Sequence, residues 1–184
     1  LPVNPEYMQL IITLSKLKMP NIDWFWFYDV PVTNKDLYDF LMNPFPTGVK
    51  HFGFNIGNES LTPIDYYFKP LVFIGSKLGE YLTISSYKMT GKQFWKLVQA
   101  YRNIKGGAIN FTHCKLETSF VPDLSVALKG FRLRRLDFDG WGRADRSDWG
   151  SHPHLFANIV EALGKVQDVR DHLKLIDMTS CGLE

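Results

Sequence analysis

Residues 173–183 read LKLIDMTSCGL and residues 106–116 read GGAINFTHCKL, and the two stretches share one spacing of apolar residues. In the first stretch, Ile176 is followed two positions later by Met178 and three positions after that by Cys181. The second stretch repeats this spacing with Ile109, Phe111 and Cys114. Successive side chains of a strand point to opposite faces, so the spacing predicts a short strand with one buried face.

The same apolar pair recurs along the chain at a nearly constant interval. Its first members are Phe25, Phe52, Leu82, Ile109, Leu136 and Ile176. They are 27, 30, 27, 27 and 40 residues apart, which indicates a repeated structural unit. The long last interval contains residues 142–154, a stretch rich in Gly, Asp, Arg and Ser that is typical of an inserted loop.

Apolar residues at helical spacing occupy the intervals between the expected strands, in residues 37–41, 64–71, 94–101, 124–128 and 156–163. Thr62-Pro63 and the segment from Ser119 to Pro122 place a capping hydroxyl and an early proline ahead of two of these helices. Thr90 is interpreted as another helix start. Each unit is therefore expected to contain a strand, a turn and a helix, repeated about five times.

This unit resembles the leucine-rich repeat, whose pattern is LxxLxLxx(N/C)xL. Residues 173–183 match the pattern in full, and residues 106–116 match it except for Gly106 in the first position. Units of 27 to 30 residues are similar to the ribonuclease-inhibitor-like and cysteine-containing subclasses. The resemblance covers nearly the whole chain. It implies an α/β solenoid, a horseshoe with parallel strands on the concave face and helices on the convex face.

We expect a single leucine-rich repeat domain over residues 1–184, with about five repeats and partial ends. A helical stripe in residues 7–17 precedes the first strand, and no helix follows the last one. Because the terminal units of repeat proteins usually carry polar caps, we also expect the chain to be a fragment of a longer repeat protein.

In such a fold, the residues between the buried strand positions face the solvent on the concave side. The candidate partner-binding residues are Trp24, Trp26, Tyr28, His51, Tyr81, Arg135, Asp137, Asp139 and Asp177, with Trp149 in the inserted loop. Exposed Trp and Tyr side chains commonly anchor interfaces. We therefore expect a partner that buries an apolar group near the first strand and offers basic groups near the acidic far end. Alternatively, a neighbouring segment of the same protein covers the aromatic residues.

The three carboxylates Asp137, Asp139 and Asp177 allow two interpretations. They could form an acid/base pair or a metal site, since neighbouring carboxylates shift each other's pKa. However, an open sheet does not exclude water, and Arg135 is a ready counter-ion, so a solvated acidic patch is favoured.

Neither the histidines nor the cysteines suggest a metal site or a disulfide. His152 and His154 lack the four spaced ligands of a structural zinc site, so no metal is expected. Cys114 and Cys181 occupy the Asn/Cys position of the pattern two repeats apart, and strands are spaced by about 4.8 Å. The resulting separation of roughly 10 Å exceeds the Cα distance of about 7 Å that a disulfide tolerates, which predicts free thiols.

Charge and composition argue against several classes of partner. The net charge of +2 gives no overall field for nucleic acid, and the longest basic cluster, Arg132, Arg134 and Arg135, is too small to be called a patch. No apolar run reaches the roughly 18 residues of a membrane-spanning helix. Having only two cysteines favours a reducing compartment, so an intracellular, cytoplasmic location is expected.

The sequence predicts a binding protein rather than an enzyme, since no nucleophile with an adjacent base is found and no cofactor is expected. The predicted function is a protein-protein interaction scaffold that binds a protein partner through its concave face and its inserted loop. One alternative is a structural subunit packed in a large assembly. Another is a GTPase-activating protein that supplies Arg135 or Arg143 to a bound GTPase. A third is an F-box-type substrate receptor.

Overall fold

The computed structural model describes residues 23–28, 49–55, 62–75, 78–85, 87–118, 122–140, 153–179 and 181, together with Glu6, Gln9 and Thr13. These residues form a mixed α/β structure with two parallel sheets, a larger one of six strands and a smaller one of three. The inserted loop falls outside them except for Pro153 and His154, which already belong to a helix. The helix expected over residues 37–41 and the candidate residue Trp149 also lie outside the described residues.

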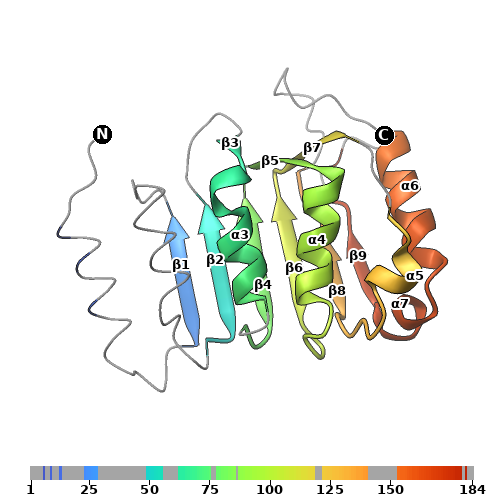
Figure 1. Ribbon diagram of the computed structural model, residues 1–184, viewed down its shortest axis with the longest axis horizontal. Coiled ribbons are helices and arrows are strands. Elements are labelled where there is room, and N and C mark those ends of the chain that lie inside the picture. Colours follow the sequence, from blue (N-terminus) through green and yellow to red (C-terminus); the bar gives the residue numbers. More distant parts are fainter. Residues whose placement is uncertain are drawn as a thin grey trace.

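The strands of the larger sheet lie side by side in the order in which they occur along the chain (Figure 1). They are β1 (Trp24–Tyr28), β2 (His51–Asn55), β4 (Tyr81–Ser85), β6 (Ala108–Thr112), β8 (Arg135–Asp137) and β9 (Leu175–Asp177). The smaller sheet contains β3 (Thr62–Pro63), β5 (Tyr87–Thr90) and β7 (Lys115–Thr118). The helices are α3 (Asp65–Ile74), α4 (Gly91–Tyr101), α5 (Leu124–Ala127), α6 (Pro153–Gly164) and α7 (Gln167–His172).

The register of the larger sheet follows the repeat found in the sequence. The first members of the six apolar pairs lie opposite one another from strand to strand, as Phe25, Phe52, Leu82, Ile109, Leu136 and Ile176. Four of them, from Phe52 to Leu136, are fully buried. The predicted strands and their alignment are therefore confirmed.

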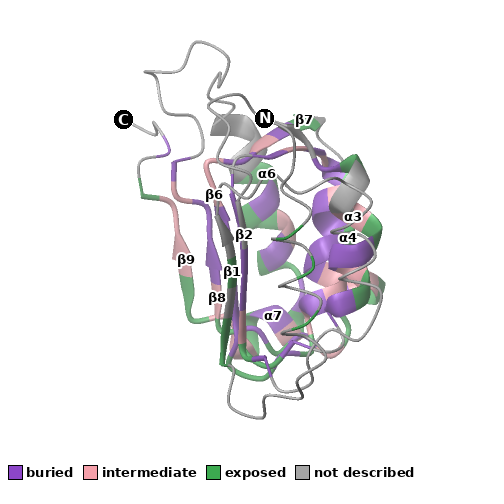
Figure 2. Ribbon diagram, turned by 90° about the vertical axis from the view of Figure 1, so that its left-hand side faces the viewer, coloured by how far each residue is buried: buried purple, intermediate pink, exposed green. Residues whose placement is uncertain are grey.

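The helices cover one face of the larger sheet, and the core lies between the two layers (Figure 2). The ring of Phe94 on α4 packs 5.1 Å from that of Phe111, and the rings of Phe111 and Phe138 stack at 6.1 Å. Four of the predicted helices correspond to α3, α4, α5 and α6. The short helix α7 was not predicted.

One predicted helix start is wrong and another is confirmed. Thr62-Pro63 forms the edge strand β3, where Thr62 pairs with Tyr87 and the proline needs no ladder hydrogen bond; α3 begins only at Asp65. Thr90 does begin a helix, because its hydroxyl accepts a hydrogen bond from the Gln93 amide while the Gln93 side chain accepts one from the Thr90 amide. At α5 the cap is Asp123, and the predicted Ser119 lies outside the described residues.

The two cysteines are buried, form no disulfide and are equivalently placed, as predicted. Cys114 Sγ donates a hydrogen bond to the carbonyl of Ile84, 3.4 Å away, and Cys181 Sγ donates one to the carbonyl of Phe138 at 2.8 Å. In each case the acceptor lies in the preceding unit, two residues after the first member of the apolar pair. Each thiol thus joins one unit to the unit before it.

Candidate interaction surface on the open face of the sheet

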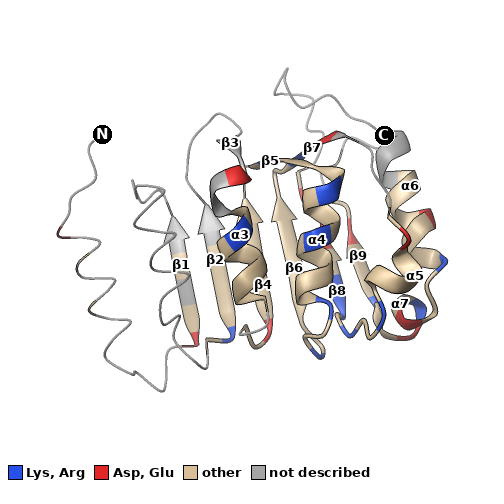
Figure 3. Ribbon diagram, in the orientation of Figure 1, with Lys and Arg blue, Asp and Glu red and all other residues tan. Residues whose placement is uncertain are grey.

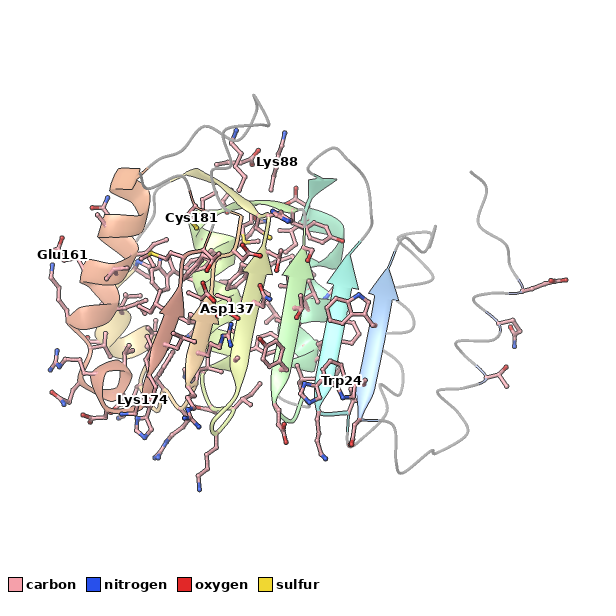
Figure 4. All side chains as sticks on the ribbon, turned by 180° about the vertical axis from the view of Figure 1, so that it is seen from behind. Trp24, Lys88, Asp137, Glu161, Lys174 and Cys181 are labelled. Carbon is pink, nitrogen blue, oxygen red and sulfur yellow. The ribbon has the colours of Figure 1, made fainter. Side chains whose placement is uncertain are left out.

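The face of the larger sheet that no described helix covers carries two rows of paired residues (Figure 4). The first row contains Trp24, His51, Tyr81, Ala108, Arg135 and Leu175. The second row contains Trp26, Gly53, Thr83, Asn110, Asp137 and Asp177. Parallel pairing therefore brings together most of the candidate residues predicted from the sequence.

The β1 end of this face is aromatic and exposed. Trp24 is 62% exposed and Trp26 is 49% exposed. The indole of Trp24 stacks on the imidazole of His51 with ring centroids 4.0 Å apart and an angle of 15° between the rings. His51 is in turn 5.7 Å from the ring of Tyr81. The three side chains form a continuous ledge over β1, β2 and β4.

His51 is held from both sides within this ledge. Its Nε2 lies 3.7 Å from Glu80 Oε2 at the edge of the sheet. Its Nδ1 is buried and has no hydrogen-bond partner among the described residues. Packing between Trp24 and Tyr81 therefore contributes more to the placement of the imidazole than hydrogen bonding does.

Gly53 helps to position Trp26, and sequence reasoning did not single it out. A Cβ built on Gly53 would lie 2.3 Å from Cε3 of Trp26, so only glycine leaves room for the indole to lie over β2. The sequence signal was a glycine between Phe52 and Phe54, in the middle of the expected second strand.

A hydrogen-bonded network occupies the opposite end of the face. The Tyr81 hydroxyl donates to Asp137 Oδ2 at 3.2 Å, reaching across β6 where the small residue Ala108 lies. Arg135 donates from Nε to Asp137 Oδ1 at 2.5 Å and from Nη2 to Asp177 Oδ2 at 3.3 Å. Asp177 also accepts hydrogen bonds from the amide and the hydroxyl of Thr179.

These contacts displace several pKa values. Burial, followed by the negative charge of Asp137, raises the pKa of the Tyr81 phenol. The hydrogen bond to Asp137 raises the pKa of the Arg135 guanidinium. The hydrogen bonds from Thr179 lower the pKa of Asp177. All three shifts favour the charge states in which the network is intact, namely a neutral Tyr81, a protonated Arg135 and an ionised Asp177.

The prediction of a solvated acidic patch is wrong at Asp137. This residue is only 2% exposed, because Arg135 and Tyr81 cover its carboxylate. Asp177 is half-buried, and Arg135 contacts both carboxylates, as expected of a counter-ion. Asp139 lies beyond β8, where its carbonyl accepts a hydrogen bond from the His113 amide. One guanidinium thus offsets part of the negative charge of the acidic end.

The middle of the face is also less exposed than predicted. Thr83, Ser85 and Ala108 are buried, because short side chains on central strands have larger neighbours on both sides. Tyr28 pairs with Asn55 at the end of β1. Among the side chains that the structure describes on this face, exposed apolar surface is thus concentrated at Trp24 and Trp26, with a smaller contribution from Leu175, which is 44% exposed.

Within the described part of the chain, no three His, Cys, Asp or Glu side chains are grouped so that they could hold a metal ion. The helices of that part are too short or too polar to cross a membrane. No protein-family model matches the sequence, and a search of curated proteins gives no match.

Proposed function

We propose that the chain forms part of a leucine-rich repeat solenoid and acts as a protein-protein interaction scaffold. Three observations support the repeat: strands paired in chain order, a register equal to the sequence period, and helices on one face. The equivalent hydrogen bonds of Cys114 and Cys181 are a fourth, since both thiols stand at the Asn/Cys position of the pattern. Buried thiols that form no disulfide fit a reducing compartment, so a cytoplasmic location is part of the proposal.

The observation that carries the binding proposal is the exposure of Trp24 and Trp26 on the open face. An aromatic side chain buries about 150–250 Å² in all, and apolar burial contributes about 25 cal/mol per Å². Covering the exposed part of each indole would therefore contribute roughly 2–4 kcal/mol before the costs of association. Two adjacent contributions of this size are typical of an interface hot spot.

The geometry also indicates what the partner should offer. An apolar or aromatic side chain fits against the ledge of Trp24, His51 and Tyr81, because one side of the ledge is open to solvent. The predicted need for basic groups at the far end is reduced, since Arg135 already pairs with Asp137 and Asp177. Polar contacts there would form the rim of the interface, where charges contribute little.

The pairing of Arg135 does not favour a GTPase-activating role. A supplied arginine must place its guanidinium at the phosphate of the partner. Here Nε and Nη2 of Arg135 are already bonded to carboxylates of β8 and β9. The other candidate, Arg143, lies outside the described residues.

The test is recovery of partners from native extract with immobilised protein. Trp24→Ala combined with Trp26→Ala should abolish recovery of the specific partners. Phe73→Ala combined with Val126→Ala is the matched control, because it removes exposed apolar side chains from helices α3 and α5 on the other layer. If the tryptophan variant folds normally and recovers every partner of the wild-type protein, the aromatic ledge is not the binding surface.

A further inference from the structure

The strands of the larger sheet all begin at one edge, and this edge is strongly basic where β6, β8 and β9 begin (Figure 3). Three loops, residues 102–107, 129–134 and 172–174, precede β6, β8 and β9 and contain no acidic residue. Their basic residues are Arg102, Lys105, Lys129, Arg132, Arg134 and Lys174. Of this set, only Arg132 and Arg134 lie close enough along the chain to stand out in the sequence.

Backbone hydrogen bonds hold the three loops side by side. The amide of Arg132 donates to the carbonyl of Arg102 at 2.5 Å, and the amide of Gly106 donates to the carbonyl of Arg132 at 3.1 Å. The amide of Lys174 donates to the carbonyl of Arg134 at 2.9 Å. Residues far apart in the sequence therefore share one edge, with neighbouring loops spaced like strands at about 4.8 Å.

Five of the six basic side chains are exposed, and we call Lys105, Lys129, Arg132, Arg134 and Lys174 the basic edge. The sixth, Arg102, joins the loops by donating from Nε to the carbonyl of Lys129 at 2.9 Å.

Within the described residues, the carboxylates nearest to the basic edge along the chain form no ion pair with its side chains. Asp168 accepts a hydrogen bond from the Gly130 amide at 2.7 Å, and Asp171 accepts one from the Gln167 side chain at 2.7 Å. Lys174 donates to the carbonyl of Asp171 rather than to its carboxylate. At the β1 side of the same edge, by contrast, Lys50 pairs with Asp23 at 3.1 Å.

We propose that the basic edge binds an acidic segment of a partner protein. Like charges on adjacent loops repel one another in the free protein, and an anionic partner relieves that repulsion. Carboxylates on one side of an extended segment recur about every 6.8 Å, within reach of long Lys and Arg side chains on adjacent loops. Exposed Leu175, directly after Lys174, offers an apolar contact to such a segment.

The chemistry of the three loops favours a peptide over nucleic acid or a membrane surface. Binding of single-stranded nucleic acid relies on exposed aromatic rings that stack on bases. Phe131 is fully buried, and the ring of His172 is partly buried and lies 3.2 Å from Arg132 Nη1. Membrane association needs several apolar side chains that can insert. Ile104 and Leu133 are buried and Leu173 is partly buried, so Leu175 is a single exposed apolar side chain beside these loops. This surface shares no residue with the aromatic ledge, so it stands independently of the function proposed above.

The experiment measures binding of a short, fluorescein-labelled glutamate-rich peptide with one central leucine, by fluorescence anisotropy at low and at physiological salt. Replacing Lys105, Arg134 and Lys174 together by Gln should weaken binding about tenfold, since three exposed ion pairs are lost and each contributes a few-fold at most. The matched control replaces Lys69, Lys92 and Lys96 by Gln, which removes the same charge from exposed positions on α3 and α4. The control should change affinity by less than about twofold.

Circular dichroism and thermal melts establish that both triple variants are folded. The proposal is overturned if the wild-type protein does not bind the peptide, or if both variants lose the same affinity, which would reduce the effect to net charge. It is also overturned if an oligothymidylate of similar charge, or vesicles containing phosphatidylserine, bind the basic edge more tightly than the peptide.

Discussion

Removing the carboxylate of Asp137 should destabilise the fold far more than its position on the open face would suggest. Asp137→Ala deletes the acceptor of two hydrogen bonds, one from Arg135 and one from Tyr81. Hydrogen bonds to charged groups contribute about 1.5–3 kcal/mol each, which gives a gross loss of about 3–6 kcal/mol.

The net loss is smaller because Arg135 has other options. Its side chain is 41% exposed, and it keeps Asp177 as a partner, so water and that carboxylate compensate for part of the loss. We expect the free energy of unfolding to fall by about 2–4 kcal/mol. For a chain of this length each kcal/mol lowers the melting temperature by about 2–4 °C.

Urea denaturation followed by circular dichroism measures the change. Glu161→Ala is the control, because it also removes a carboxylate from an ion pair, to Lys165 at 2.7 Å, but on the exposed surface of α6. The control should have a much smaller effect. Equal effects of the two substitutions, or a negligible effect of Asp137→Ala, would refute the conclusion that burial makes the Asp137 network important.

Three further outcomes are expected. Gly53→Ala should displace the indole of Trp26 and destabilise the fold by about 1–3 kcal/mol, visible as a changed tryptophan emission and a lower urea midpoint; an unchanged emission would contradict the close approach. The lowered pKa of Asp177 means that its contribution to stability is present above the ordinary value of 3.8 and is lost as the pH falls through the lower folded value. Thr179→Ala should therefore raise the Asp177 pKa in an NMR titration and make the free energy of unfolding less dependent on pH in that range. An unchanged Asp177 pKa would argue against Thr179 as the cause of the shift. Both cysteine thiols should resist a water-soluble thiol reagent until denaturant is added, and rapid labelling of the native protein would contradict their burial.

Sequence reasoning predicted the alignment of the strands in the larger sheet because one physical signal determines it. Apolar side chains at alternate positions mark each strand, and a constant interval between such pairs aligns the strands laterally. The smaller sheet has no comparable signal. Its strands contain two to four residues, and the register shifts between Met89 and Thr90, so no alternation is long enough to recognise.

The candidate site was predictable only as far as strand register determines it. The exposure of Trp24 and Trp26 is confirmed because both occupy alternate positions on the open face. Asp137 occupies an equivalent position but is buried by Tyr81, which lies on a strand two places away. A contact of this kind depends on the length of the tyrosine side chain and on a small residue on the strand in between. The spacing of apolar residues in the sequence gives neither.

Each strand of the larger sheet pairs with the strands of that sheet that precede and follow it along the chain, and this arrangement has a mechanical consequence. In such an arrangement, tension on the two ends of the chain loads the terminal strands first, and interior strands are shielded until their neighbours have detached. Extension should then proceed as a series of small steps, one for each strand and its following helix, instead of a single rupture. The contour length released at each step would correspond to the interval between successive strands.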